Sequence, residues 1–378
     1  MTSLGDVIIT ARLARGLTQA ELAGMIEVTQ PALHRYEHGL RDPEPEILAR
    51  LARVLGVTEE FLLHAGAVRG AMAVDAHMRR RATEKATTWR RLEAQLNEYR
   101  MHASKLFEQV SLQAGQIIPA FDPEGTRARE AARLVRMQWR MPVGPVRDLT
   151  GWLEAAGCIV LAEAFGTPRI DGLSQWVDDH PVILLNSQAP TDRQRWTLAH
   201  EAGHLSLHAS FIGDDPEADA DEFAAEFLMP AEMIRPQLRN LTIGRLTDLK
   251  RQWGVSMQAL VERAHQLGVI PAGQRTSMYK QFSRMGWRTR EPISDELPPE
   301  QPRLTVTITQ ALIDRGFTPQ DIATLAGFAD ADHNSMFVPP AARALRAVLT
   351  CDGPLALDWL SSRAVAGFNK EPSAKIGT

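Results

Sequence analysis

Residues 193–208, RQRWTLAHEAGHLSLH, constrain the fold of this chain more than any other stretch. Two histidines, His200 and His204, stand four residues apart, and Glu201 directly follows the first. On an α-helix, residues four apart lie on one face, one turn from each other. Both histidines can therefore reach one metal ion, while Glu201 projects about 100° away, beside such an ion and not on it. We expect a helix over residues 191–209.

This spacing is typical of hydrolytic zinc sites, in which a carboxylate beside the ion takes a proton from bound water. A catalytic zinc needs three protein ligands and an open position. A third histidine in the pattern HExxHxxGxxH is excluded, because Leu207 and Ser210 occupy the glycine and final histidine positions. His208 lies one turn beyond His204 but is rotated further round the helix, which makes it a poorer ligand.

A glutamate from the following helix is the other source of a third ligand. The segment PEADADEFAAEFLMP offers Glu217, with Asp221 one turn later. Glu217 would complete a His-His-Glu site, and Asp221 would hydrogen-bond a ligand histidine and fix its tautomer. Asp219, two residues after Glu217, and His208 remain alternatives. The five-residue pattern alone also occurs in many proteins that are not enzymes, so the helical context and the downstream acidic residues are what favour a metal site.

Further motifs surround this pattern in a fixed order. They are IDGLSQW, PVILLN, TDRQRWTLAHEAGHLSLH and EADADEFAAEFLMP between Ile170 and Pro230, followed by LTDLKRQWGVSMQALVERAHQLGVI over residues 246–270. Together they resemble the ImmA/IrrE family of zinc metallopeptidases. The resemblance covers roughly residues 125–290, and it is specific because it needs several separated motifs in order.

The resemblance implies a role for each residue of the pattern. His200, His204 and Glu217 would bind Zn²⁺, and Glu201 would be the catalytic acid/base. It also implies a protein substrate, because peptidases of that family cut a Cro-type repressor and so release stress or mobile-element genes from repression.

A tetrahedral intermediate normally needs a second electrophile besides zinc. The candidates for this oxyanion stabiliser are Tyr279 and His208, and Tyr279 fits a packing role as well.

A second motif lies near the N-terminus. In residues 18–39, TQAELAGMIEVTQPALHRYEHG, two helices are separated by a short turn, and Thr18 with Glu21 forms a capping box. Residues 5–64 resemble the Cro/repressor type of helix-turn-helix family, whose second helix enters the major groove. Glu37, near the end of that helix, is expected to belong to the fold. The expected contacts with DNA are Thr29, Gln30, His34 and Arg35.

The charge of this module counts against tight DNA binding. Residues 1–66 hold six Arg and no Lys against nine Asp and Glu, a balance of −3. Phosphate attraction supplies much of DNA affinity, so a monomer would bind weakly. The module would compensate by dimerising or by using the basic stretch 79–91, or it would recognise a protein instead. The whole chain carries a net charge of −4, which indicates neither a nucleic acid nor a membrane partner.

The chain is expected to be α+β and mostly helical. Strands are expected at residues 158–163, 173–177 and 182–186, and EPISDELPPEQP, residues 291–302, reads as a linker. The helices at 246–265 fit either a second helix-turn-helix or a closure of the peptidase core. The expected domains are a helix-turn-helix domain at 1–66, a helical linker at 67–114, a zincin-like metallopeptidase domain with a small β-sheet at 115–290, and a C-terminal helical accessory region of unknown role at 291–378.

The cysteine content and the N-terminus bear on the compartment. The chain has 378 residues and two cysteines, Cys158 and Cys351, which excludes a disulfide framework and a cysteine-based zinc site and fits a reducing cytosol. The N-terminus has no basic flank before a long apolar run, and no stretch is apolar enough to cross a bilayer. We expect a cytoplasmic protein without a membrane partner.

Two functions fit these features. One is a zinc-dependent, site-specific peptidase coupled to transcriptional regulation, which cuts a Cro-type repressor or its own linker. The other is a dimeric DNA-binding regulator whose peptidase-like domain is a non-catalytic sensor or interaction module. The intact histidine pattern together with Glu217 favours the enzyme.

Overall fold

The computed structural model of the chain describes residues 3–64, 86–110, 112, 114–122, 125–177, 180–208 and 215–339. The expected linker residues 67–85 and the C-terminal residues 340–378, with Cys351, lie outside the described residues.

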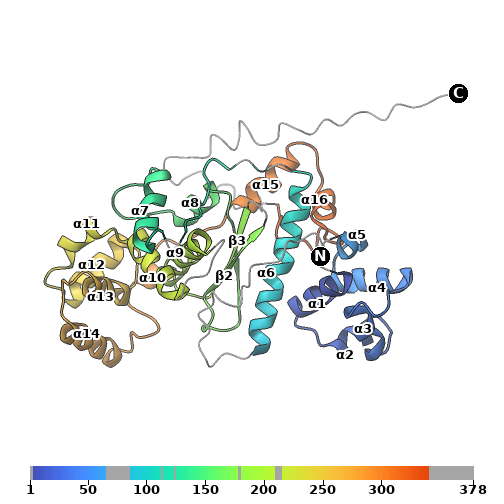
Figure 1. Cartoon of the computed structure of the whole chain (residues 1–378), viewed down its shortest axis with the longest axis horizontal. Coiled ribbons are helices and arrows are strands. Elements are labelled where there is room, and N and C mark those ends of the chain that lie inside the picture. Colours follow the sequence, from blue (N-terminus) through green and yellow to red (C-terminus); the bar gives the residue numbers. More distant parts are fainter. Residues whose placement is uncertain are drawn as a thin grey trace.

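A small mixed sheet stands at the centre of the molecule (Figure 1). Its strands are β1 (Ile159–Glu163), β2 (Gly172–Val177) and β3 (His180–Asn186), in the order β1-β3-β2. Strand β1 runs parallel to β3, and β2 runs antiparallel to it, with Ser174 opposite Ile183. The expected small sheet is confirmed, and β2 forms one of its edges.

Both faces of the sheet are buried. Successive side chains of a strand point to opposite faces, and in β1 and β3 the side chains on both faces are apolar. Val160, Ile183 and Leu185 belong to one apolar core, and Ile159, Val182 and Leu184 belong to a second. The first core also contains residues of α7 (Ala128–Gln138), α8 (Leu149–Ala155), α9 (Thr191–Leu207) and α10 (Pro216–Leu228). The second contains residues of α6 (Ala86–Phe107), α15 (Leu304–Ile313) and α16 (Pro319–Ala326).

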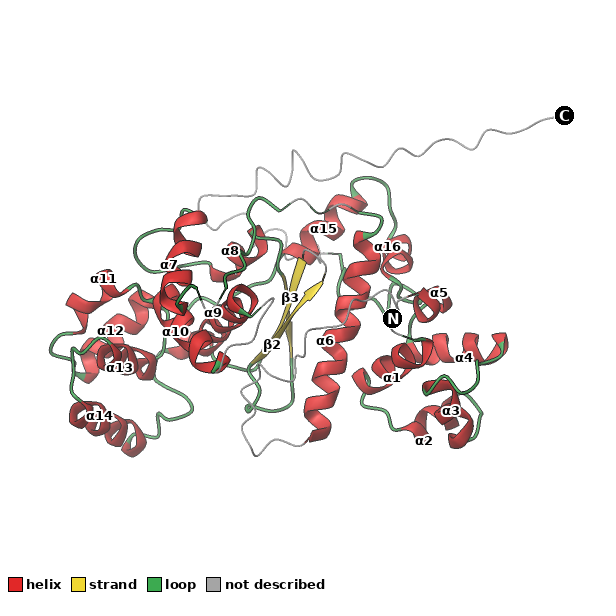
Figure 2. Cartoon of the chain, viewed as in Figure 1, coloured by secondary structure: helices red, strands yellow, loops and turns green. Residues whose placement is uncertain are grey.

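A further group of helices extends the first core away from the sheet (Figure 2). It consists of α11 (Ala231–Ile234), the 3₁₀ helix η3 (Arg235–Leu238), α12 (Ile243–Trp253), α13 (Met257–Gln266) and α14 (Ala272–Arg284). Leu246, Trp253 and Leu260 are buried in the same core as Leu198 of α9 and Phe223 of α10. This packing supports the interpretation in which these helices close the peptidase core.

The N-terminal domain has its own apolar core. Its helices are α1 (Leu4–Ala14), α2 (Gln19–Met25), α3 (Gln30–Glu37), α4 (Pro45–Leu55) and α5 (Glu59–His64). The capping box of Thr18 and Glu21 opens α2 as expected. Gly56 ends α4 with a φ of 63°, a left-handed conformation that glycine adopts without strain.

Helix α6 lies between this N-terminal domain and the sheet (Figure 1). One side of it places Leu92, Leu96 and Leu106 in the core shared with the sheet. From its other side, the buried Glu98 accepts a hydrogen bond from Arg15 of α1 at 2.6 Å. The second half of the expected linker is therefore a packed element that contacts both neighbours.

The C-terminal region takes part in the same contact. His102 of α6 is stacked between Phe61 of the N-terminal domain and Phe328, with ring centroids 4.3 and 3.7 Å away. Its Nδ1 lies 2.7 Å from the Ala326 carbonyl oxygen, and burial lowers the pKa of His102 to about 3. A β-bridge joins Val57 to Phe328. Residues 304–337 are thus part of the folded body that holds the N-terminal domain.

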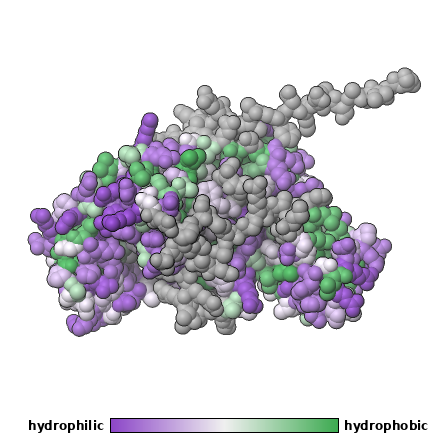
Figure 3. Space-filling view, viewed as in Figure 1, coloured by the Kyte–Doolittle hydropathy of each residue, from purple (hydrophilic) through white to green (hydrophobic). Residues whose placement is uncertain are grey.

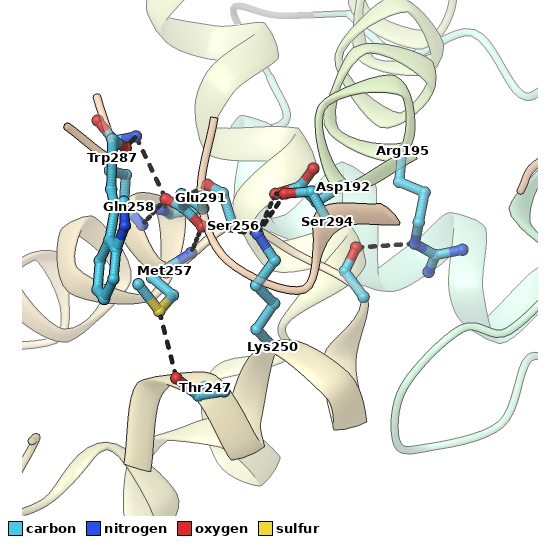
Figure 4. Close-up of polar contacts among 12 residues, drawn as sticks. Asp192, Arg195, Thr247, Lys250, Ser256, Met257, Gln258, Trp287, Glu291 and Ser294 are labelled. Carbon is cyan, nitrogen blue, oxygen red and sulfur yellow. Dashed lines mark hydrogen bonds and ion pairs between the residues drawn. The ribbon is translucent and has the colours of Figure 1, made fainter. Parts of the chain in front are cut away.

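The structure corrects one expectation, the linker at residues 291–302. Glu291 and Ser294 are buried and receive hydrogen bonds from Lys250 Nζ, each at 2.8 Å (Figure 4). Glu300 is buried as well, forms an ion pair with Arg195 and accepts a hydrogen bond from the Thr150 amide. The segment is a strap fixed to α8, α9 and α12. Its acidic residues suggested solvent exposure because their cationic partners lie far away in the sequence.

Among the described residues, no helix is both long enough and apolar enough to cross a membrane.

Candidate metal centre

Helices α9 and α10 bring the expected ligands together. His200 and His204 lie on α9 and are buried, and Glu217 lies in the first turn of α10, where its side chain is half-buried. Gly203 permits the close approach of the two helices, because a Cβ atom there would lie 3.2 Å from Ala220 Cα and from Phe223 Cβ.

The ligand atoms of these three residues converge. The two histidine Nε2 atoms are 3.0 Å apart, and the Glu217 oxygens lie 3.5 Å from His200 Nε2 and 3.4 Å from His204 Nε2. A tetrahedral ion with bonds of about 2.1 Å holds its ligand atoms about 3.4 Å apart. Both Glu217 oxygens are shielded from solvent and lack a well-formed hydrogen bond within the described structure. This donor set fits a metal ion.

Each ligand histidine has a partner on its other nitrogen. His200 Nδ1 lies 3.0 Å from Asp221 Oδ1, and His204 Nδ1 lies 3.1 Å from His208 Nδ1. His208 Nε2 in turn faces Asp219 Oδ2 at 3.8 Å. Such contacts leave Nε2 as the ligand atom and fix the orientation of each ring. Asp221 thus contacts His200, whereas His208 and Asp219 lie behind His204.

Glu201 is held beside the converging atoms by a residue that the sequence reasoning missed. Ser174 Oγ of β2 donates a hydrogen bond of 2.6 Å to Glu201 Oε2. Strand β2 approaches α9 closely, since a Cβ atom on Gly172 would lie 2.5 Å from Thr197 Cγ2. Ser174 stands inside the IDGLSQW motif, but only the pairing of β2 with β3 shows that it faces α9.

Carboxylates dominate the electrostatics of this cluster. Burial lowers the pKa of His200, but the hydrogen bond with Asp221 and the nearby carboxylates of Glu217 and Glu201 outweigh it and raise the pKa to about 9. Burial raises the pKa of Glu217, but the adjacent imidazoles of His200 and His204 outweigh it and lower the pKa to about 2. The cluster therefore attracts positive charge, which a divalent cation would supply.

The structure places Tyr279 among other partners. It lies on α14, where its hydroxyl group donates a hydrogen bond to Glu262. Burial is the largest cause of its raised pKa, and the contact with Glu262 adds to it. The guanidinium groups of Arg275 and Arg288 lie 5.5 and 5.0 Å from the centre of its ring. The structure therefore does not group Tyr279 with the converging atoms of α9 and α10.

The expected DNA contacts lie on the surface of α3 and the residue before it. Thr29, Gln30, His34 and Arg35 are all exposed. Glu37 is buried, as expected, and pairs with Arg12 at 2.5 Å. Gln19 Nε2 donates to Glu37 at 2.6 Å, and Gln30 Nε2 donates to Gln19 at 2.7 Å. This chain of hydrogen bonds orients Gln30 at the start of the helix.

Family comparisons match the two parts of the chain separately. Residues 153–265 match the model described as the IrrE N-terminal-like domain, and residues 8–62 match a helix-turn-helix model. The first range contains the whole metal centre, and the second contains α3. The chain thus combines a helix-turn-helix domain with a domain of a metallopeptidase family.

Two curated relatives agree with this division. The radiation response metalloprotease IrrE of Deinococcus deserti is 39% identical over 105 residues, which is 22% of this chain and 37% of that protein. The SPbeta prophage-derived uncharacterized HTH-type transcriptional regulator YonR of Bacillus subtilis is 30% identical over 59 residues, which is 16% of this chain and 55% of that protein. The matches therefore span about a third to just over half of each relative.

Proposed function

We propose that this chain is a zinc-dependent, site-specific peptidase coupled to transcriptional regulation. The observation that carries the proposal is the convergence of His200 Nε2, His204 Nε2 and the Glu217 carboxylate, with Glu201 beside them. Two imidazoles and one carboxylate are a donor set of catalytic zinc sites.

Each residue of the centre then has a distinct role. When bound, zinc supplies Lewis acidity and lowers the pKa of water. His200, His204 and Glu217 would hold the ion, and Asp221 and His208 would orient the two imidazole rings. Ser174 holds Glu201 Oε2, which leaves Oε1 to accept a proton and return it to the leaving amine.

The position of Glu201 suggests how a substrate is bound. Strand β2 is an edge strand, and its Ser174 contacts Glu201. A peptide laid along such an edge is held by main-chain hydrogen bonds, so the substrate would be an extended segment. We propose an inter-domain stretch of a Cro-type repressor, or the part of this chain's own residues 67–125 that lies outside helix α6.

Incubation of the full chain with zinc and candidate repressors tests the proposal. Wild-type protein should yield discrete fragments, of a partner or of itself, that a chelator abolishes. Glu201→Gln keeps the shape of the side chain and should retain zinc, but should cut about 10²–10⁴-fold more slowly. Fragments that persist at the wild-type rate in this variant would come from another protease.

One contact favours a second candidate, a DNA-binding regulator in which the metal centre is a sensor. Helix α6 packs on the sheet that carries Ser174 and, through Glu98, on α1 of the helix-turn-helix domain. The DNA-binding domain would bind DNA as a dimer, with α3 of each copy in the major groove. If zinc-loaded wild-type protein cuts nothing while its DNA binding responds to metal removal, this sensor function replaces the enzymatic one.

A further inference from the structure

Helix α14 and the residues after it form a strongly basic stretch of the described chain. Residues 272–290 contain five cationic side chains and neither Asp nor Glu, within a chain whose net charge is −4. The five are Arg275, Lys280, Arg284, Arg288 and Arg290. The helix-turn-helix domain, by contrast, has a negative balance, which leaves it with little attraction for phosphate.

Ion pairs divide these five cations into two groups. Arg275 pairs with Glu262 at 2.8 Å, and Arg290 pairs with Asp295 at 2.7 Å. Lys280, Arg284 and Arg288 are exposed, and no carboxylate in the described parts of the chain forms an ion pair with them. We call these three residues the α14 cations.

The α14 cations border a single hollow of about 400 Å³. It is lined by Thr276, Tyr279, Lys280, Ser283, Arg284 and Arg288. Thr276, Lys280 and Arg284 follow one another at intervals of four residues, so they lie along one face of the helix. Each residue that lines the hollow carries a hydroxyl group or a cation, and Arg288 rests on the Tyr279 ring.

The helix presents this face from a fixed position. On its opposite side, Met278 and Phe282 are buried in the core that also contains α9 and α10. The Tyr279 ring is fixed from two sides, by the hydrogen bond to Glu262 and by the two guanidinium groups. Figure 3 shows a largely hydrophilic surface at this end of the molecule. The cations are therefore displayed by a rigid support.

We propose that this face of α14 binds the sugar-phosphate backbone of double-stranded DNA. Exposed cations and hydroxyl groups on a helix are the groups that contact backbone phosphates, and they do so without reading sequence. The hollow offers no aliphatic anchor of the kind that protein interfaces use. In Figure 1, α14 and α3 lie along the same lower edge of the molecule, at opposite ends. The α14 cations would supply the phosphate attraction that the helix-turn-helix domain lacks.

A salt series with the full chain tests this inference. The probe is a fluorescent duplex of random sequence, and the readout is the slope of log Kd against log salt concentration. Each phosphate contact contributes about 0.9 to that slope. Lys280→Gln/Arg284→Gln/Arg288→Gln should therefore reduce the slope by about 2 to 3 and weaken binding at low salt by about tenfold or more.

A matched variant removes the same charge elsewhere in this group of helices. Arg235, Arg239 and Arg245 are exposed on and around η3 and α12, so Arg235→Gln/Arg239→Gln/Arg245→Gln should leave the slope near the wild-type value. Equal slopes for wild type and both triple variants would overturn the inference. Competition by polyglutamate as strong as that by duplex DNA of equal charge would also overturn it, in favour of an acidic protein partner.

The inference rests on the proposed DNA binding, but the two can fail separately. Gln30→Ala/Arg35→Ala should abolish preference for an operator, whereas the α14 triple variant should weaken binding to an operator and to the random duplex alike. If no operator is preferred by wild type while the α14 variant still loses slope, the helix-turn-helix proposal fails and the α14 inference stands. An unchanged melting temperature of each variant confirms that the exposed substitutions leave the fold intact.

Discussion

Helix α9 carries buried charged groups toward both of its ends, and the two clusters differ in how their charges are satisfied. Near its N-terminus, Asp192 meets Lys250, which also contacts Glu291 of the strap (Figure 4). Arg195, one turn later, pairs with Glu300 of the strap. Nearer its C-terminus, His200 and His204 meet Glu217. The first cluster consists of opposite charges in direct contact. In the second cluster, the Nε2 atoms of the two histidines and the Glu217 oxygens converge on one position that a metal ion could occupy.

The strap cluster is self-contained. Lys250 Nζ donates to Asp192 at 2.6 Å, to Glu291 at 2.8 Å and to Ser294 at 2.8 Å. Glu291 also accepts the amide hydrogens of Met257 and Gln258 at the start of α13. The ammonium group thus uses all three of its donors. Although Asp192 Oδ1 has no hydrogen-bond partner within the described structure, the buried charges of this cluster pair directly with one another, so the cluster supports the fold.

The comparison teaches how burial alone can mislead. Both clusters are buried and highly charged, yet only the metal centre combines an excess of acceptors with close, unbridged nitrogen and oxygen atoms. The predictions below test this difference.

The largest effect should follow from the loss of Lys250. Lys250→Met leaves Asp192 and Glu291 buried without their cation, which should reduce the free energy of unfolding by about 3–5 kcal/mol. Arg251→Met is the matched control, because the neighbouring Arg251 forms only an exposed pair with Glu296 and should lose at most about 1 kcal/mol. Urea unfolding measures both. Equal losses would mean that the strap cluster contributes no more than a surface ion pair.

Zinc should stabilise the other cluster by a similar amount. Zinc at about a thousand times its Kd should add about 4 kcal/mol to the stability of wild-type protein, with about one zinc bound per chain. His204→Ala and Glu217→Ala should lose both the metal and the stabilisation, as measured by elemental analysis and thermal unfolding. Asp219→Asn should keep them. Loss of zinc in Asp219→Asn with retention in Glu217→Ala would move the third ligand to Asp219.

Glu154 of α8 is a buried carboxylate outside both clusters, and within the described structure neither a buried cation nor the metal centre lies beside it. Burial raises its pKa to about 7, although it accepts the amide hydrogens of Arg303 and Leu304. A raised pKa means that the folded state binds the proton more tightly, so this stabilisation is present below about pH 4.5 and is lost as the pH rises to about 7.

Glu154→Gln keeps the acceptor oxygen and removes the titration. The stability of wild-type protein should therefore fall, relative to this variant, by about 3 kcal/mol between pH 4.5 and 7.5. Chemical unfolding across this pH range measures the difference. If the free energy of unfolding changed with pH in the same way for both proteins, the ionisation of Glu154 would not destabilise the fold.

The smallest effect concerns the contact between β2 and the metal centre. Ser174→Ala removes the hydrogen bond to Glu201 and should slow peptide cleavage by about 10- to 150-fold, because a hydrogen bond to a charged group is worth about 1.5–3 kcal/mol. The zinc content should not change. Ser174→Thr keeps the hydroxyl group and should restore part of the rate. An equal loss in both variants would indicate a disturbed strand and not a lost hydrogen bond.

The sequence predicted features that depend on local spacing. The histidines of α9 and the capping box of α2 follow from the spacing of residues within one helix, and β1 and β3 follow from short apolar runs. Glu217 and Asp221 could be found because they share one short segment with a spacing of four.

Features that depend on distant pairings were missed. Lys250 and Asp192 are 58 residues apart and Ser174 and Glu201 are 27 apart, so no local pattern links them. The strap looked like a linker for the same reason, because its Glu, Pro and Ser residues are typical of exposed segments. Helix α6 showed helical periodicity, but the two neighbours that bury its opposite sides lie elsewhere in the sequence.

The stack of Phe61, His102 and Phe328 has a consequence for a chain that cuts itself. The N-terminal domain is joined to the rest of the molecule by that stack, by the bridge from Val57 and by ion pairs of α6, independently of the covalent connection between residues 65 and 85. A cut in that connection would give two bands on a denaturing gel, yet we expect the pieces to elute together from a gel-filtration column. Self-cleavage there would remove the tether and leave the DNA-binding domain in place, so its release would require a second event that separates Phe61 from His102.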